Sequence, residues 1–129
     1  MLTPEAKTMI QSKIDQLKPS EVQMMIDESP DSIAIIDVRE PWEYASDTGH
    51  VIGSRLIPMN EIPENLEELK ELSASRKLGI ICNSGQRSYY TAAFLKQNGI
   101  TNVFNIDGGI IKWILSGLEV EYGSGTDGK

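Results

Sequence analysis

Cys82, the only cysteine of the 129-residue chain, stands between an apolar run and a short polar loop. The run, residues 78–81, is typical of a buried strand, and a helix is predicted to follow the loop at residues 88–97. A thiol in this place is held in a fixed position, where unpaired backbone N–H groups and the positive helix end favour its thiolate. The position of Cys82 therefore predicts that its thiolate is a nucleophile.

A lone cysteine is most often a small buried apolar residue and not a nucleophile. Two further loop residues help to decide between these two roles for Cys82. Gly85 lets the backbone turn its N–H groups inward. Arg87 supplies planar donors for an anion. They favour an anion-binding loop around the thiol. The loop residues are Asn83, Ser84, Gly85, Gln86, Arg87 and Ser88.

The number of residues between Cys82 and Arg87 distinguishes two anion chemistries. Protein tyrosine phosphatases and a fold-related group of phosphatases have five residues at this point, a larger ring that wraps a phosphate. This chain has four. The shorter ring suits a single sulfur atom, and it disfavours a small cysteine-based phosphatase or arsenate reductase.

Short apolar runs alternate with helical patterns along most of the chain. The predicted strands are residues 33–36, 54–57, 78–82 and 103–106. Continuous apolar runs of this length are typical of strands buried on both faces of a parallel sheet. The alternation predicts an α/β fold with helices on both faces of the sheet. Ligands of such sheets bind beyond the carboxyl ends of the strands, where both Cys82 and the segment from Asp37 to Arg39 fall.

The first 18 residues are predicted to form an amphipathic helix outside the main domain. Thr3 and Pro4 make a good helix start, and the apolar residues 6, 10, 14 and 17 fall on one face. This face must lie on the domain or on a second subunit, so a homodimer through the helix is one expectation. A short edge strand near residues 15–18 competes with the helix there. Residues 19–122 are predicted to form the domain, and the glycine-rich residues 123–129 a flexible tail.

The charge and the cysteine count restrict the partners and the compartment. Twelve basic and nineteen acidic side chains give a net charge of −7. This excess argues against nucleic acid or an anionic membrane as the main partner, so an anionic substrate must be attracted locally. The N-terminus has no apolar core of a signal peptide, and no stretch reaches membrane-spanning length. One cysteine permits no internal disulfide, which suits a reducing compartment, so a cytoplasmic protein is expected.

Four segments resemble the single-domain rhodaneses, or thiosulfate-type sulfurtransferases, over residues 19–121. Residues 37–44 (D-V-R-E-P-W-E-Y) match the family's D-V-R-E-x-x-E-[FY], and residues 49–54 are similar to its G-H-I-P-G-A. Residues 82–88 (C-N-S-G-Q-R-S) match its active loop C-x-S-G-x-R-S, and residues 108–113 match its late G-G-x-x-x-W. The chain departs from the pattern at Ile52, Ser54 and Leu56, all outside the loop.

The resemblance implies a rhodanese-like fold with about five strands and a sulfurtransferase that needs neither cofactor nor metal. Cys82 would take the sulfane sulfur of a small anionic donor, thiosulfate or a persulfide, and hold it as a persulfide. A thiol, on a small molecule or a protein, or cyanide would then remove it. The alternative is a noncatalytic rhodanese-like module that binds a protein or senses redox state. The intact thiol and the glycine-bearing loop favour the enzyme.

Several side chains around the loop have two interpretations. Arg87 either contacts the donor or pairs with a carboxylate to brace the loop. Asp37 and Arg39 are either catalysts or a structural pair beneath the loop, and the structural pair is predicted. The predicted rim that a donor meets is Asn83, Ser84 and Gln86.

The histidine and the tryptophans receive structural predictions. His50 is the only histidine, and we expect it to brace or cap a loop, because activation of the thiolate by backbone dipoles needs no general base. Trp42 and Trp113 are expected to pack in the core or at the rim.

Overall fold

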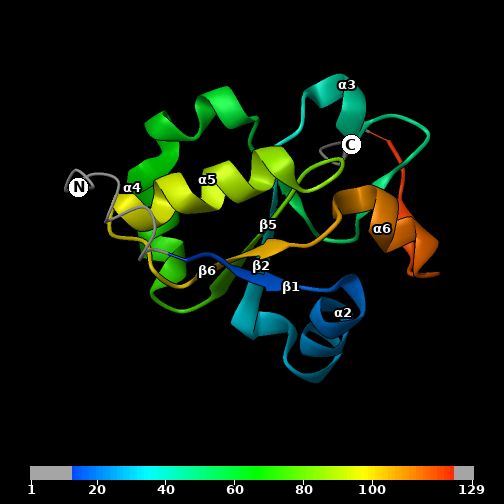
Figure 1. Cartoon of the computed structure of the whole chain (residues 1–129), viewed down its shortest axis with the longest axis horizontal. Coiled ribbons are helices and arrows are strands. Elements are labelled where there is room, and N and C mark those ends of the chain that lie inside the picture. Colours follow the sequence, from blue (N-terminus) through cyan, green and yellow to red (C-terminus); the bar gives the residue numbers. More distant parts are fainter. Residues whose placement is uncertain (1–12, 124–129) are drawn as a thin grey trace, which may run out of the picture.

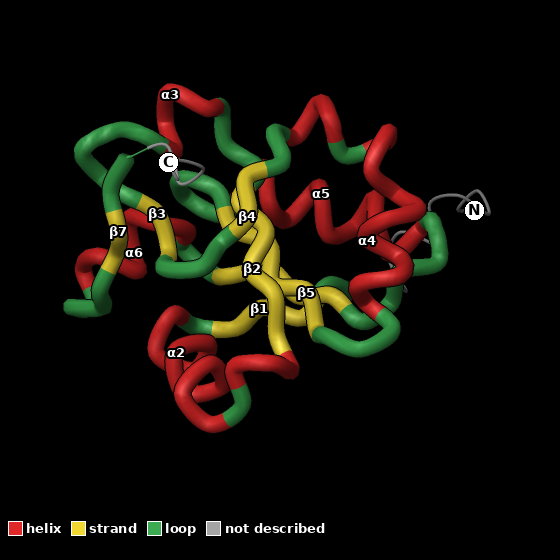
Figure 2. Tube along the Cα trace, turned by 180° about the vertical axis from the view of Figure 1, so that it is seen from behind, coloured by secondary structure: helices red, strands yellow, loops and turns green. Residues whose placement is uncertain are grey.

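A five-stranded sheet lies at the centre of the computed structural model, which describes residues 13–123 (Figure 1). The strands follow the order β1-β6-β5-β2-β4, and every neighbouring pair is parallel. They are β1 (Asp15–Leu17), β2 (Ile33–Asp37), β4 (Arg55–Leu56), β5 (Lys77–Ile81) and β6 (Val103–Ile106). Two more strands, β3 (His50–Val51) and β7 (Val120–Glu121), form a separate antiparallel pair (Figure 2). The predicted parallel α/β fold is confirmed.

Helices cover both faces of the sheet (Figure 1). One face carries α4 (Leu66–Ser73) and α5 (Gln86–Gln97), and the other carries α2 (Pro19–Glu28) and α6 (Gly109–Leu115). The short helix α3 (Pro41–Tyr44) follows β2, and 3₁₀ turns span Pro30–Ser32, Met59–Glu61 and Pro63–Asn65. No helix within residues 13–123 is long and apolar enough to cross a membrane.

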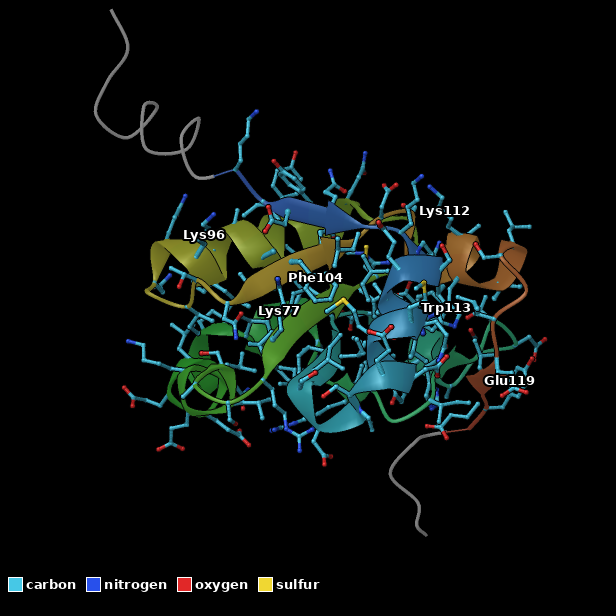
Figure 3. The ribbon with its side chains drawn as sticks, turned by 90° about the horizontal axis from the view of Figure 1, so that it is seen from below. Lys77, Lys96, Phe104, Lys112, Trp113 and Glu119 are labelled. Carbon is cyan, nitrogen blue, oxygen red and sulfur yellow. The ribbon has the colours of Figure 1, made fainter. Side chains whose placement is uncertain are left out.

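Two apolar cores result, because successive side chains of a strand point to opposite faces. Leu78 and Ile80 of β5 pack beneath α4 and α5, whereas Ile81 belongs to the core beneath α2 and α6. Phe104 of β6 lies in this second core, and its ring occupies the place of the side chain that Gly79 lacks. A Cβ on Gly79 would lie 2.6 Å from Phe104 Cζ. Figure 3 shows Lys77 beside the same ring, with its Nζ 5.9 Å from the ring centroid.

The N-terminal segment corrects one prediction. Asp15–Leu17 is strand β1, so the helix predicted over residues 1–18 is wrong there, and the competing edge strand is confirmed. Strand β1 pairs with the edge of β6, and the Asp107 N–H donates to the Leu17 carbonyl at 2.9 Å. This pairing outweighs the helical periodicity, because an open sheet edge offers unpaired backbone groups. Residues 1–12 and 124–129, where the rest of the predicted helix and most of the predicted tail fall, lie outside the described residues.

Candidate active site

Cys82 comes directly after β5, at the carboxyl end of the central strand of the sheet. Only 1% of its surface is exposed. Its Sγ accepts two hydrogen bonds, from the Gly85 N–H at 3.1 Å and from the Ser88 hydroxyl at 3.2 Å. Two donors directed at one sulfur atom stabilise negative charge on it, as in an oxyanion hole. These two neutral donors can therefore stabilise the predicted nucleophile without a positively charged side chain.

Gly85 allows the loop to turn back on the thiol. It precedes α5 with a φ of 106°, a backbone conformation that side-chain-bearing residues rarely adopt. A Cβ here would also lie 3.1 Å from the Gly108 nitrogen. The left-handed turn brings the Gly85 N–H to Sγ at the start of α5, where the helix dipole is positive. On the loop, Ser84 and Gln86 are exposed and Asn83 is half-buried.

The start of α6 supports the loop from the other side. The Ile110 N–H donates to the Cys82 carbonyl at 2.9 Å, and the Ile111 N–H donates to the Asn83 carbonyl at 3.2 Å. Gly109 has a φ of 63°, and a Cβ on it would lie 2.6 Å from the Cys82 oxygen. The two backbones approach so closely that only glycine fits between them.

Trp113 anchors α6 in the core. It is fully buried, and its Nε1–H donates to the Glu119 carbonyl at 3.0 Å, so the indole also holds the chain that leaves the helix (Figure 3). The segment at residues 108–113 thus combines a glycine contact to the loop with a tryptophan that fixes the helix. This is the packing role predicted for Trp113, whereas Trp42 is 73% exposed on α3.

Arg87 pairs with Glu43 of α3. Its Nη1 and Nη2 donate to the two carboxylate oxygens, each at 2.8 Å. These hydrogen bonds lower the pKa of Glu43 to about 2, from an ordinary 4.5, against the opposing effect of burial. They also raise the pKa of Arg87. The structure therefore contains the carboxylate pair of the bracing interpretation, and Glu43 is the partner.

Asp37 and Arg39 form the predicted structural pair. Both are buried, and Arg39 Nη2 donates to Asp37 Oδ2 at 2.9 Å. The same guanidinium donates to Thr48 Oγ1 at 3.0 Å and to the Gly49 carbonyl at 2.9 Å. It also reaches the Glu43 carbonyl at 3.3 Å. The pair therefore fixes the segment that carries the partner of Arg87, and it acts on the loop through that segment.

His50 braces the same segment. Its Nδ1 lies 3.0 Å from the Tyr44 carbonyl, and its ring stacks on the Tyr44 ring with centroids 3.7 Å apart. Its Nε2 lies 3.3 Å from Glu121 Oε2, outside hydrogen-bond geometry. These contacts join α3 to β7 and agree with the structural role predicted for His50.

Sequence reasoning did not single out Asn105, which supports the loop from below. It lies on β6 and is 1% exposed, and its Nδ2 donates to the Gly85 carbonyl at 3.2 Å and to Gln16 Oε1 at 3.0 Å. An asparagine inside an apolar strand is the signal that could have identified it, because buried amides need partners. Glu43 was noted only as part of a motif, without a partner.

Comparison with known proteins gives the family. A family model described as "Rhodanese-like domain" matches residues 18–116, most of the chain. The chain belongs to this family. The sulfurtransferase of Allochromatium vinosum is 36% identical to this rhodanese-like domain over 90 residues, which cover 70% of this chain and 79% of that protein.

Two further proteins show the range of settings in which such a domain occurs. The tRNA uridine(34) hydroxylase of Salmonella agona is 35% identical over 103 residues, but the match covers only 28% of that protein and 77% of this chain. The crystal structure of a rhodanese-like domain protein from Staphylococcus aureus superposes with a TM-score of 0.70 at 31% identity, over 84% of this chain and 99% of that chain. The family and the Allochromatium relative support a sulfurtransferase-type role.

Proposed function

We propose that this rhodanese-like domain moves a sulfane sulfur from thiosulfate or a persulfide donor to a thiol or cyanide, through a persulfide on Cys82. The observation that carries the proposal is the pair of hydrogen bonds to Sγ, from the Gly85 N–H and the Ser88 hydroxyl. They lie in a loop with four residues between Cys82 and Arg87, at the carboxyl end of the central strand. Such a site stabilises a sulfur anion in a small space.

The first half-reaction loads the cysteine. The Cys82 thiolate attacks the outer sulfur of the donor, and a new S–S bond forms on the enzyme. The bond between that sulfur and the rest of the donor breaks, and its electron pair leaves with sulfite or with a thiolate. No electrons are gained or lost overall. The outer sulfur of the Cys82 persulfide then carries the negative charge that the loop N–H groups and the α5 dipole stabilise.

The second half-reaction regenerates the thiolate. A thiolate acceptor, on a small molecule or a protein, or cyanide attacks the outer sulfur, and the electron pair of the S–S bond returns to Cys82. One cysteine is enough for the cycle, which fits the single cysteine of the chain. Since the cycle needs a reduced thiol, a reducing compartment such as the cytoplasm is part of the proposal.

Mass spectrometry of the intact protein tests this function. After incubation with thiosulfate or a persulfide and removal of the donor, we expect the mass of one added sulfur atom, and cyanide should remove it. Cys82→Ser is the control and should gain nothing. If the wild-type protein gains no sulfur from either donor, the noncatalytic alternative replaces the enzyme; ready hydrolysis of an aryl phosphate without a persulfide would indicate a phosphatase.

A further inference from the structure

Every cationic side chain in the three segments that build the active site is paired with a carboxylate. In residues 37–44, 82–88 and 105–113 the cations are Arg39, Arg87 and Lys112. Arg39 pairs with Asp37 at 2.9 Å, Arg87 with Glu43 at 2.8 Å, and Lys112 with Asp107 at 3.0 Å. The described walls of the site therefore have no net positive charge with which to attract a donor.

The Arg87–Glu43 pair is the one nearest to the chemistry, because Arg87 closes the loop that holds Cys82. Glu43 is only 14% exposed, whereas Arg87 is 37% exposed. Glu43 is also fixed on its own helix, since its Oε1 accepts the Glu40 N–H at 2.9 Å. A carboxylate held in this way keeps the two terminal nitrogens of the Arg87 guanidinium on α3.

This neutral site treats the two classes of sulfur donor differently. Thiosulfate carries two negative charges, and its outer sulfur is bonded directly to a bulky sulfonate. Its approach to a thiolate is opposed by charge repulsion that no unpaired cation offsets. An organic persulfide carries at most one charge on its reacting end, and its outer sulfur stands at the tip of a slender S–S arm. Since Cys82 is 1% exposed, a slender arm reaches Sγ more easily.

A hollow beside the loop suits the organic part of a persulfide. It measures about 250 Å³ and includes Ser84, Gly85 and Gln86 of the loop. Tyr89 and Tyr90 form the aromatic part of its wall, and Gln16 and Asp107 complete it; Tyr90 is 64% exposed. Aromatic walls bind apolar groups, whereas the sulfonate of thiosulfate gains nothing from them.

We propose that Glu43 determines donor specificity: by neutralising Arg87 it makes the site prefer organic persulfides of low charge over thiosulfate. The inference rests on the proposed function, because it concerns the donor of the same Cys82 persulfide. Glu43 acts through Arg87, so it is a positioning residue.

The test measures kcat and KM for thiosulfate and for benzyl hydrodisulfide, an aromatic persulfide whose organic part carries no charge, in wild type and in Glu43→Gln. Glutamine has nearly the same shape and still offers an oxygen to the Glu40 N–H, but it leaves the Arg87 charge uncompensated. We expect the wild type to prefer the persulfide. In Glu43→Gln, kcat/KM for thiosulfate relative to that for the persulfide should rise roughly fivefold, the size of one partly exposed charge interaction. The rise should come from a lower KM for thiosulfate.

Two further variants separate this effect from a general one. Glu68→Gln removes a carboxylate from a similar bidentate pair with Arg55, between α4 and β4, and it changes the net charge by the same amount. It should leave the ratio of the two donors unchanged. The double variant Glu43→Gln/Arg87→Gln should lose the gain for thiosulfate.

The outcomes distinguish this inference from the proposed function. If the wild type loads Cys82 from both donors and Glu43→Gln leaves their ratio unchanged, or if the wild type prefers thiosulfate, the role of Glu43 is overturned and the persulfide enzyme stands. A gain in thiosulfate turnover that persists without Arg87 overturns it as well. If no sulfur reaches Cys82 from either donor, the proposed function fails and this inference fails with it.

Discussion

The Cys82 sulfur accepts one hydrogen bond from the backbone and one from a side chain, and these differ in how they can be tested. The backbone N–H of Gly85 is fixed by the turn. The hydroxyl of Ser88 is fully buried and can be removed by substitution. In the described part of the chain, Ser88 is the one side chain that donates to Sγ.

Ser88→Ala should lower kcat for sulfur transfer about tenfold, because a hydrogen bond to a charged group is lost. Steady-state kinetics with thiosulfate and cyanide would measure this. Thr91→Val is the matched control, since its buried hydroxyl lies on the same helix but donates to the Arg87 carbonyl. Equal activity of Ser88→Ala and wild type would mean that the hydroxyl does not stabilise the reacting sulfur.

Cys82→Ser should reduce sulfur transfer to the uncatalysed rate while the thermal unfolding midpoint changes little. Serine is slightly smaller than cysteine and can accept hydrogen bonds from the same two donors. The rate of thiocyanate formation, together with thermal melts followed by circular dichroism, checks both parts. Residual catalysis by the folded variant would require another nucleophile.

The Arg87–Glu43 pair should make stability depend on pH in the acid range. The pKa of Glu43 is about 2 in the folded protein and 4.5 ordinarily, so the folded state binds the proton less readily. The contribution of the pair to the free energy of unfolding is present above about pH 4.5 and is lost as the pH falls toward 2. Because Arg87 is 37% exposed, we expect the pair to contribute only about 1 kcal/mol to the free energy of unfolding.

Urea unfolding of wild type and Glu43→Gln at several pH values would measure this contribution. The difference in unfolding free energy should be constant from pH 7 to 5 and should shrink below pH 4.5. A difference that grows with acidity would have the wrong sign for a carboxylate with a lowered pKa.

At the scale of elements, the active loop lies between the starts of two helices, α5 and α6. Both starts contain glycines with positive φ: Gly85 before α5, and Gly108 and Gly109 at α6. The loop conformation therefore depends on α6, although within the described residues no side chain of α6 donates a hydrogen bond to Sγ.

Gly109→Ala should destabilise the protein by about 3 kcal/mol or more and reduce sulfur transfer, because the new Cβ combines backbone strain with a collision. It would lie 2.5 Å from the Asn83 carbonyl carbon. Gly117→Ala is the matched control, since Gly117 has a φ of 78° but open space around it. Thermal melts and turnover of the two variants separate strain from collision. Equal losses would show that the close approach of α6 to the loop is unimportant.

The elements that the sequence predicted well are those with local signals. The apolar run before Cys82, the glycine in the loop and the helix after it lie within twenty consecutive residues, so the strand, turn and helix could be predicted together. Strand β1 has only three residues and exists because β6 offers an edge. Helix α2 begins at Pro19 with Lys18 as its cap, and the Lys18 N–H donates to Glu21.

Long-range side-chain pairs explain what sequence reasoning missed at the site. Glu43 and Arg87 are 44 residues apart. Nothing in either local pattern indicates which carboxylate meets which guanidinium, because the pairing is set by how α3 and α5 lie across the sheet. The sequence therefore indicated that Arg87 had a role but left two roles open.

At the scale of the whole molecule, the net charge of −7 opposes the approach of an anionic donor. The KM for thiosulfate should therefore fall when sodium chloride is raised from about 10 to about 150 mM, because the Debye length shrinks from about 30 to about 8 Å. A persulfide with a single charge should show a smaller change. A thiosulfate KM that rises with salt would indicate net attraction and an unpaired cation at the site.

The contact between Gln16 and Asn105 joins residues 89 positions apart and lies directly beneath Gly85. The two parts of the site are synthesised at different times, because Cys82 precedes β6 and α6 in the chain. A growing chain that stops before Val103 carries the thiol, but it lacks the asparagine and the glycines that hold the loop. We therefore expect a chain that stops at this length to accept no sulfur, and the nucleophile to become competent only after β6 and α6 have been made. We expect the order of translation to leave the thiol idle until these supports have been made.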